Sequence, residues 1–379
     1  MQPFKQLFFS TNSNTNQCSK KTSSKKLLSA ISLAATLVIS PLFTPAAHAE
    51  QKKEFTLAWS IYVGWMPWDY ADYSGILDKW ADKYGIDINV VQVNDYVESI
   101  NQYTAGQFDA TVMTNMDALT IPAASGVDST AVVVGDFSDG NDGIVLKGDK
   151  TLQDIKGQNV NLVELSVSHY LMARALESIG LSEKDVKVVN TSDADIVSAF
   201  STDDVSSVVT WNPMLSEIKS QPNTSLVFDS SKTPGEIIDL LVANSQTLKD
   251  NPAFGKALTG AWYEIMGIMA SKDQAKADVA KTYMAKAEGT DLAGFNAQLD
   301  DTKMFYSPSE AVKFTQSSDL KKTMQKVAEF SFDHGLLGEG APDASFIGIE
   351  TPSGVFGNPS NIKLRFTDKY MTMAAKGEL

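Results

Sequence analysis

The sequence is short of cysteine, histidine and arginine, and each shortage excludes a class of chemistry. The 379 residues contain one cysteine, Cys18, three histidines and two arginines, Arg174 and Arg365. A single thiol near the N-terminus forms no internal disulfide, and the rest of the chain has no cysteine nucleophile and no cysteine-ligated zinc. Two arginines also leave few guanidinium groups with which to bind an anion.

Positive charge is the second shortage. Lysine and arginine total 32 against 46 acidic residues, so the formal net charge is −14. Nucleic-acid binding needs a basic surface, and anionic lipid attracts basic segments, so both partners are disfavoured. We expect no nucleic-acid partner.

The N-terminal segment is typical of a secretory signal peptide. A lysine-bearing polar stretch precedes the apolar run from Leu28 to Phe43, and Ala47-His48-Ala49 follows as a small-x-small cleavage site. The alternative is an uncleaved anchor, but the run is short for a membrane span and Pro41 interrupts it. We therefore expect residues 1–49 to be removed and the protein to be periplasmic.

Strand-like and helix-like segments alternate after residue 50. Phe55–Trp59, Ile86–Val93 and Phe108–Met113 have strand patterns, and Trp68–Tyr84 has helical spacing. A second cycle begins near Lys147, and the chain from residue 252 onward has mainly helical patterns, including a long one over 308–332. This pattern predicts mostly parallel sheets covered by helices, an α/β fold.

The length of the chain predicts two lobes. About 330 residues remain after residues 1–49 are removed, which is more than one hydrophobic core usually supports. We expect residues 50–146 and 243–379 to form lobe 1 and residues 147–242 to form lobe 2. Ligands of open parallel sheets bind beyond the carboxyl ends of strands, so the residues that follow each strand are the candidate site.

Aromatic residues gather after the first expected strand. Trp59, Tyr62, Trp65 and Trp68 fall within ten residues, in a loop that also contains glycine and proline. One interpretation is hydrophobic packing within the lobe. The other is an aromatic wall for a flat or cationic ligand, since ring faces carry negative potential.

Short polar side chains follow two further strands. Asn115 and Asp117 lie at a strand-to-helix turn, where they are either helix caps or ligand contacts. The run from Asp136 to Gly143 lacks the spacing of a calcium loop, which leaves Asp142 as a ligand candidate near the hinge. We assign no metal site and no cofactor.

The second lobe offers another set of candidates. Glu164, Ser166 and His169 follow an expected strand and open a helix. His169 is the only histidine placed to serve a catalytic triad, and there is no Gly-x-Ser-x-Gly elbow, so we expect no enzyme activity. Ser166 is expected to cap the helix, whereas Glu164 is a cleft carboxylate or a surface acid.

A tryptophan-asparagine pair and a late glutamate complete the candidates. Trp211 and Asn212 end a strand before Pro213, so the ring either packs internally or faces the first aromatic cluster across the cleft. Glu236 lies in a polar loop that leads back toward the first lobe, as a cleft acid or a solvated one. Carboxylates and rings, rather than arginines, favour a small cation or a planar group with many N–H donors over an anion.

These residues carry a resemblance to a known family. The chain resembles periplasmic substrate-binding proteins of ABC importers, in the branch of taurine, alkanesulfonate, nitrate and thiamine-precursor binders. The segments that carry this likeness are 154–157, 168–171, 180–181, 185–186 and 211–213. A subfamily found beside urea and guanidine carboxylases is similar over the segments 59–68, 114–117, 163–169, 234–239 and 335–338.

The resemblance implies a fold, a ligand and a partner. It implies the two-lobed type II periplasmic-binding-protein fold with a central ligand cleft, and a monomer that delivers guanidine or a urea-like compound to a membrane permease driven by a cytoplasmic ATPase. In our hypothesis Glu164 or Asp117 pairs with the cation, indole rings stack on it, and Asn115 and Asn212 orient it.

Two alternatives stay open on the same fold. The first is a binder of an anionic solute such as taurine, an alkanesulfonate or nitrate. The second is an enzyme, which would need a reactive histidine or lysine in the cleft.

Overall fold

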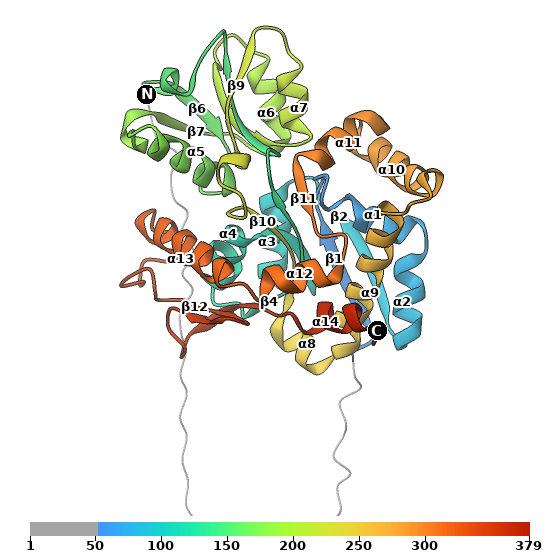
Figure 1. Ribbon diagram of the computed structural model, residues 1–379. Helices are drawn as coiled ribbons and strands as arrows, with labels where there is room; N and C mark the ends of the chain where they lie inside the picture. The colour runs from blue at the N-terminus through green and yellow to red at the C-terminus, as the bar shows by residue number, and fades with distance from the viewer. Residues whose placement is uncertain (1–51) are drawn as a thin grey trace, which may run out of the picture. The chain divides into compact units, whose positions relative to one another are not determined.

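The computed structural model describes residues 52–379, and the predicted signal peptide lies outside them. Within this range no helix is both long and apolar enough to cross a membrane. The described chain forms two β-sheets, each covered by helices (Figure 1).

The first sheet has nine strands and carries most of the chain. Along the sheet the strands are β13 (Gly354–Phe356), β12 (Gly348–Thr351), β14 (Ile362–Phe366), β4 (Ser129–Ser138), β10 (Ile238–Asn244), β3 (Ala110–Thr114), β1 (Glu54–Trp59) and β2 (Asp87–Gln92). β11 (Thr302–Met304) pairs with β4 outside this path.

The second sheet has five strands and lies in the green and yellow part of Figure 1. Its order is β7 (Lys187–Asn190), β6 (Asn159–Leu162), β8 (Ser207–Trp211), β5 (Asp142–Lys147) and β9 (Thr224–Asp229). The sheets are mixed rather than mostly parallel, because β10 runs antiparallel to β3 and β4, and β5 runs antiparallel to β8 and β9. The reversal occurs in strands next to the points where the chain crosses between sheets.

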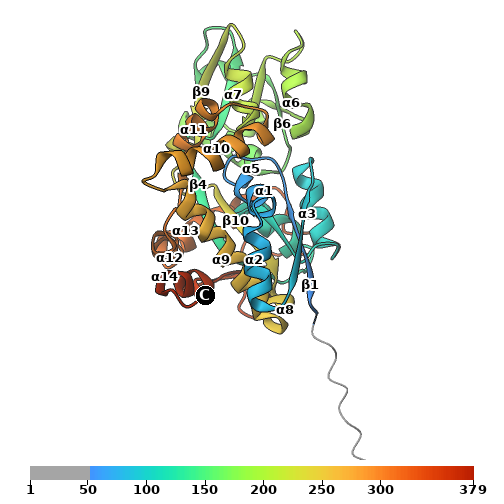
Figure 2. The same ribbon diagram turned by 90° about the vertical axis from the view of Figure 1, so that its right-hand side faces the viewer.

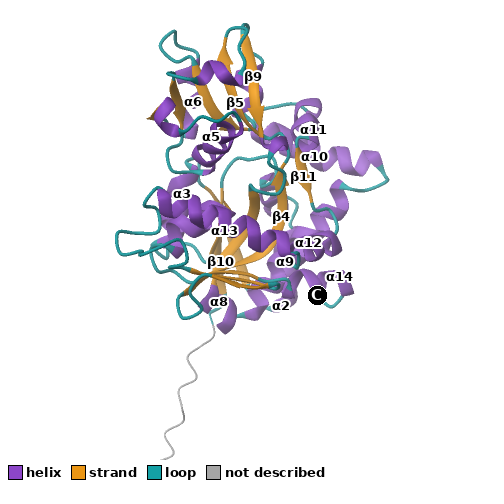
Figure 3. Ribbon diagram, turned by 60° about the vertical axis from the view of Figure 1, so that its left-hand side comes forward, coloured by secondary structure: helices purple, strands orange, loops and turns teal. Residues whose placement is uncertain are grey.

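Helices cover both sheets, as the view coloured by secondary structure shows (Figure 3). They are α1 (Met66–Tyr73), α2 (Ile76–Tyr84), α3 (Tyr96–Thr104), α4 (Asn115–Ala118), α5 (Val167–Ser178), α6 (Asp193–Phe200), α7 (Met214–Lys219), α8 (Ser245–Asp250), α9 (Pro252–Met269), α10 (Gln274–Glu288), α11 (Leu292–Asp300), α12 (Pro308–Thr315), α13 (Ser318–Asp333) and α14 (Lys369–Lys376). Figure 2 shows α2 and α9 side by side beside the first sheet.

Two predicted helices are each divided in the structure. The segment expected to be one helix over 68–84 breaks at Gly75, whose φ of 70° lies in the left-handed region that a continuous helix does not use. The segment expected over 308–332 breaks where Ser317 caps α13 by accepting the N–H of Leu320. Local turn and cap chemistry overrides the apolar spacing at both points.

The chain crosses between the two sheets twice. The first crossing is residues 139–141, between β4 and β5, and the second is residues 230–237, between β9 and β10. The predicted lobe boundaries at 146/147 and 242/243 lie several residues beyond these points. The first sheet carries one large apolar core, and the second sheet has a separate apolar cluster against α5 and another against α6 and α7.

Candidate functional site

A small pocket lies where the chain crosses between the two sheets. Its lining consists of Tyr62, Trp65, Tyr96, Thr114, Asp142, Val167, Trp211, Ile237 and Asp239. The cavity volume is about 20 Å³, whereas one water needs roughly 10–15 Å³. The pocket therefore suits a solute of very few atoms rather than a drug-sized molecule, which needs several hundred cubic ångströms.

Strand register explains why these residues meet. In the second sheet Trp211, at the end of β8, is paired with Asp142, at the start of β5. In the first sheet Asp239, near the start of β10, is paired with Thr114 on one side and Asp136 on the other. Directly paired residues have Cβ atoms about 4.5–5.5 Å apart, so each sheet brings a carboxylate into contact range of the pocket wall.

Four aromatic rings form a continuous chain around the pocket. The ring centroids of Tyr62 and Trp65 are 4.8 Å apart, those of Trp65 and Tyr96 5.4 Å, and those of Tyr96 and Trp211 5.8 Å. The first three rings come from elements of the first sheet and Trp211 from the second. The faces of such rings, but not their edges, attract a cation.

Four buried acids surround this wall: Asp117, Asp136, Asp142 and Asp239. The hydroxyl of Tyr62 donates to Oδ1 of Asp136 over 3.0 Å, and the hydroxyl of Ser138 donates to Oδ2 of Asp142 over 2.5 Å. Within residues 52–379 no lysine or arginine lines the pocket, and none hydrogen-bonds to any of the four acids. The second carboxylate oxygen of Asp136 accepts from no amide, hydroxyl or basic group within the same residues, and the Asp136 side chain lies beside the carboxyl group of Asp239.

Burial disfavours ionisation of these carboxyl groups. It raises the pKa of Asp142 to about 7 and that of Asp117 to about 6. Burial likewise raises the pKa of Asp136 to about 7, and it raises the pKa of Asp239 further because the neighbouring Asp136 repels a second negative charge. One of the two carboxyl groups in the adjacent pair Asp136 and Asp239 therefore carries a proton near neutral pH. An incoming cation would displace that proton.

Tyr96 is held in place by a network behind the pocket. Asp95 caps α3 by accepting the N–H of Glu98, which fixes the start of the helix at Tyr96. The Tyr96 hydroxyl donates to Oδ2 of Asp117 over 2.6 Å and accepts the N–H of Thr114 over 3.0 Å. Asp117 consequently supports the ring from behind and does not line the pocket.

Four of the residues predicted from the sequence line the pocket: Tyr62, Trp65, Asp142 and Trp211. Two other predicted rings do not. Trp59 is buried in the core of the first sheet, and Trp68 packs against Trp262 with ring centroids 5.2 Å apart. The hydrophobic-packing interpretation therefore describes Trp59 and Trp68.

The predicted polar residues Asn115, Asn212 and Ser166 hold the backbone near the pocket instead of facing it. The Asn115 amide donates to the carbonyl of Glu236, and its Oδ1 accepts the N–H of Ile238. The Asn212 amide donates to Oδ1 of Asn141 over 2.7 Å. Ser166 caps α5, as predicted, by accepting the N–H of Ser168.

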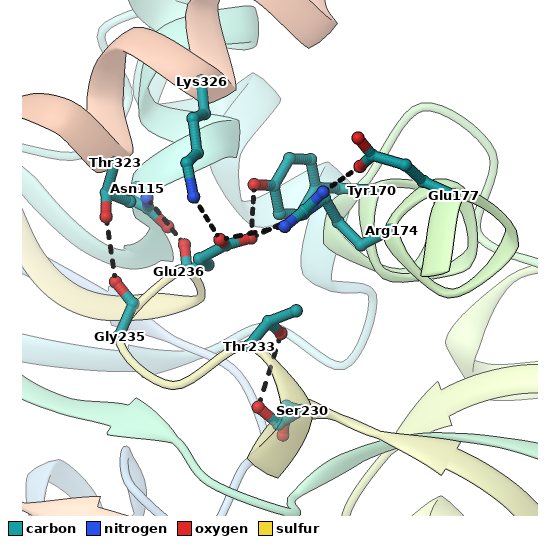
Figure 4. A network of polar contacts seen from close by, with 10 residues as sticks. All are labelled: Asn115, Tyr170, Arg174, Glu177, Ser230, Thr233, Gly235, Glu236, Thr323 and Lys326. Atoms are coloured by element: carbon teal, nitrogen blue, oxygen red, sulfur yellow. Dashed lines mark hydrogen bonds and ion pairs between the residues drawn. The ribbon is translucent and has the colours of Figure 1, made fainter. Parts of the chain in front are cut away.

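Glu164 lies where the surface-acid interpretation places it, whereas Glu236 is neither a free cleft acid nor a solvated one. Glu164 is exposed and does not line the pocket, and the next residue, Leu165, has a φ of 64° in the left-handed region. Glu236 is buried but already paired, as Figure 4 shows. It accepts hydrogen bonds from Arg174 Nε over 2.9 Å, from Lys326 Nζ over 2.8 Å and from the Tyr170 hydroxyl over 2.7 Å.

The contacts of Glu236 connect the two sheet layers. Arg174 lies on α5, which packs on the second sheet, and Lys326 lies on α13 of the other layer. Burial alone would raise the pKa of the Glu236 carboxyl, but hydrogen bonds from Arg174, Lys326 and Tyr170 lower it below its usual range. Glu236 is thus an interlobe clasp and not a free ligand for a cation.

His169 also lies outside the pocket lining. Its ring is buried and contacts Glu183 and His334. It faces neither Asp142 nor the aromatic wall, so the structure does not place it for catalysis on a solute in the pocket.

Sequence reasoning missed Tyr96, Asp136 and Asp239. Asp136 and Asp239 each sit within or beside an otherwise apolar strand, and an acid in a buried strand is a signal that could have been used. Tyr96 has no such signal, because its role depends on the packing of α3 against β3.

Comparisons with known proteins agree with this architecture. The NMT1/THI5-like family profile matches residues 79–275. A Brucella abortus (strain 2308) protein named as a binding protein is 22% identical over 259 residues, which cover 68% of this chain and 79% of that protein.

Solved structures with the same fold include two sulfonate binders and a nitrate binder. The alkanesulfonate-binding protein SsuA from Xanthomonas axonopodis pv. citri has a TM-score of 0.63 at 16% identity, covering 77% of this chain and 96% of that one. The aliphatic sulphonate-binding protein SsuA from Escherichia coli has a TM-score of 0.61 at 18% identity, and the match covers 76% of this chain and 94% of that one. The nitrate-binding protein NrtA from Synechocystis PCC 6803 has a TM-score of 0.54 at 12% identity, and the match covers 85% of this chain and 98% of that one.

Family and fold follow from these findings. The structure has the two-lobed α/β fold of periplasmic binding proteins, as the sequence predicts. Because the profile spans more than half of the sequence, the chain belongs to the NMT1/THI5-like family.

Proposed function

We propose that this protein is an extracytoplasmic solute-binding protein that captures guanidine, or a related small nitrogenous cation, for an ABC importer. One observation carries the ligand class: Asp142 and Asp239 enter a ring-lined pocket that has no basic residue within the described chain. A buried carboxylate without a cationic partner is costly, and a bound cation would remove that cost.

The guanidinium ion matches the chemistry of this wall. It is small, planar and positively charged, and all its polar atoms are N–H donors. Asp142 and Asp239 offer acceptors from the two sheets, while Trp65 and Trp211 offer ring surfaces from the two sheets. Closure of the lobes around the ion would exclude water and strengthen each charge-assisted hydrogen bond.

The partner and the location belong to the same proposal. Residues 1–49 would direct secretion and be removed, and the loaded protein would dock on a membrane permease driven by a cytoplasmic ATPase. The sulfonate- and nitrate-binding proteins of similar fold support the binding-protein part of this proposal.

A second candidate ligand is an anion such as taurine, an alkanesulfonate or nitrate. The names of the similar structures favour it. Protonated Asp142 and Asp136 could also donate hydrogen bonds to an oxyanion, since burial raises the pKa of each to about 7. The two candidates predict opposite pH dependence, because an anion requires the protonated acids and a cation displaces their protons.

Isothermal titration calorimetry on residues 50–379 distinguishes the candidates. The panel is guanidinium, methylguanidinium, urea, taurine and nitrate, each at pH 8 and pH 5.5. We expect guanidinium to bind and to bind more tightly at pH 8. Binding of taurine or nitrate that strengthens at pH 5.5, with no binding of guanidinium, would contradict the proposal.

A further inference from the structure

Two of the three histidines in the chain meet away from the pocket, although they lie 165 positions apart in the sequence. His169 is in α5, on the second sheet, and His334 directly follows α13, which packs with the first-sheet core. Glu183, in the short helix η3 (Glu183–Asp185), lies between them. The cluster therefore joins the two layers, as the Glu236 clasp does, but with a different set of side chains.

The geometry directs three ligand atoms to one point. His334 Nε2 lies 2.6 Å from Glu183 Oε2, and His169 Nε2 forms a hydrogen bond with Glu183 Oε1. One ligand atom from each residue lies within 4.8 Å of the other two. The side chains are 6%, 31% and 18% exposed for His169, Glu183 and His334, so the cluster is mostly enclosed yet open on the Glu183 side.

Two imidazoles and one carboxylate are a donor set that suits zinc. Zinc binds imidazole nitrogen and carboxylate oxygen at about 2.0–2.2 Å, and sites with three protein ligands keep a fourth position for water. The outer shell of His334 fits this role, because its Nδ1 donates to the Phe330 carbonyl over 2.7 Å. A hydrogen bond of this kind fixes the ring and leaves the Nε2 lone pair for the metal.

We propose that His169, Glu183 and His334 form an interlobe site for Zn²⁺ or a similar divalent transition-metal ion. The metal inserts between the Glu183 carboxylate and the two imidazole nitrogens, each of which now contacts that carboxylate directly. Glu183 supplies the needed movement, since it lies in a short, partly exposed turn.

Metal binding releases the proton that His334 Nε2 shares with Glu183 Oε2, and it also changes the tautomer of His169, which serves as a marker. His169 Nδ1 accepts the backbone N–H of Leu165 over 3.1 Å, so Nε2 carries the proton of the neutral ring. A neutral imidazole that binds the metal through Nε2 must carry its proton on Nδ1 instead. The Leu165 N–H then loses this acceptor and turns to water, which its exposed position in a loop permits.

The site would bias the protein toward the form in which the lobes touch. His334 comes from the first-sheet side, and His169 and Glu183 come from the second-sheet side. All three residues can therefore bind the ion only when the two lobes are in contact. This consequence rests on the proposed function: zinc should raise guanidinium affinity, and guanidinium should raise zinc affinity by the same factor.

The test is titration of ZnCl₂ into residues 50–379 that have been treated with EDTA and dialysed. We expect one ion per chain by calorimetry, and a rise in melting temperature with ZnCl₂ but not with MgCl₂. Outer-shell substitutions around metals cost about 10–100-fold in affinity, so loss of a ligand in His334→Ala or Glu183→Gln should cost about 100-fold or more. The matched control is Glu329→Gln, an acid on α13 whose side chain contacts Gln325 instead of the cluster.

Folding and site occupancy are checked separately. Circular dichroism establishes that each variant is folded, and His334→Gln replaces His334→Ala if the latter is not. In ¹⁵N spectra the Leu165 amide should shift on zinc addition in the parent protein and not in His334→Ala. Zinc affinity that is equal in the parent, His334→Ala and Glu183→Gln would overturn the site, since the ion would then bind elsewhere. Zinc binding at the cluster without any change in guanidinium affinity would retain the site and overturn only its link to closure.

Discussion

Two groups of buried acids in this protein have opposite electrostatic environments. Around the pocket, burial raises the pKa of Asp142 to about 7, and no lysine or arginine within the described residues offsets its charge. At the interlobe clasp, Arg174, Lys326 and Tyr170 lower the pKa of Glu236 despite burial. The comparison shows that a buried acid alone does not indicate a binding site. The missing positive partner is the informative feature.

The largest expected effect is on ligand binding by the unpaired acids. Asp142→Asn and Asp239→Asn each remove one ionisable carboxyl group from the pocket with little change in shape. We expect guanidinium affinity to fall by about 100-fold or more, in line with the roughly 2–5 kcal/mol that follows loss of one member of a buried charge pair. Calorimetry measures this, with a circular dichroism spectrum to confirm folding. Unchanged affinity in both variants would remove these acids from the site.

The paired acid should behave in the opposite way. Glu236→Gln leaves the Arg174 and Lys326 charges without their shared partner, so the free energy of unfolding should fall by about 1–3 kcal/mol after allowance for the solvent around Lys326. Urea denaturation measures the loss. The comparison fails if Glu236→Gln is as stable as the parent while Asp142→Asn is destabilised.

The electrostatic environment of the pocket acids also predicts how guanidinium affinity depends on pH. Below pH 7 the pocket acids become protonated, so guanidinium affinity should fall by about tenfold per pH unit between pH 7 and 5 for each proton displaced. Calorimetry at successive pH values gives this slope. A flat profile would mean that no pocket carboxyl group changes its protonation when the ligand binds.

The stability of the ligand-free protein depends on the same acids. It should fall as the pH rises, whereas guanidinium affinity should increase. Between about pH 4 and pH 7 the folded state keeps protons on Asp142 and Asp136 that the unfolded state has released, so stability falls as the pH rises. Glu236 and Asp128 have lowered pKa values, so their contribution is lost as the pH falls below about 4. Thermal melting should therefore show a maximum at about pH 4. Asp142→Asn should reduce the loss on the alkaline side.

The smallest effect is expected at Glu164, which the sequence nominates and the structure leaves exposed. Glu164→Gln should leave both guanidinium affinity and melting temperature unchanged within error. It is the matched control for Asp142→Asn, since both remove one carboxylate charge. A clear loss of affinity in Glu164→Gln would show that the binding surface extends beyond the pocket described above.

Some of the site is readable from local sequence. Tyr62 and Trp65 follow β1, Asp142 and Trp211 are terminal residues of β5 and β8, and all four line the pocket. Strand ends are where α/β folds bind ligands. Trp59 and Asn115 occupy similar positions but face the core or the backbone. The positions of strand ends reduce the number of residues that are candidates for the pocket lining. Which way each side chain points depends on tertiary packing, and no local sequence pattern encodes that packing.

The α/β alternation, the small number of basic groups and the aromatic loop after the first strand can all be predicted from the amino-acid order, because they are properties of composition and period. Three features depend on tertiary contacts: Asp239 is a pocket acid without a cationic partner, Glu236 is neutralised, and His169 meets His334 across two layers. Burial and charge pairing arise between residues far apart in the chain, and these contacts set the protonation and function of each side chain.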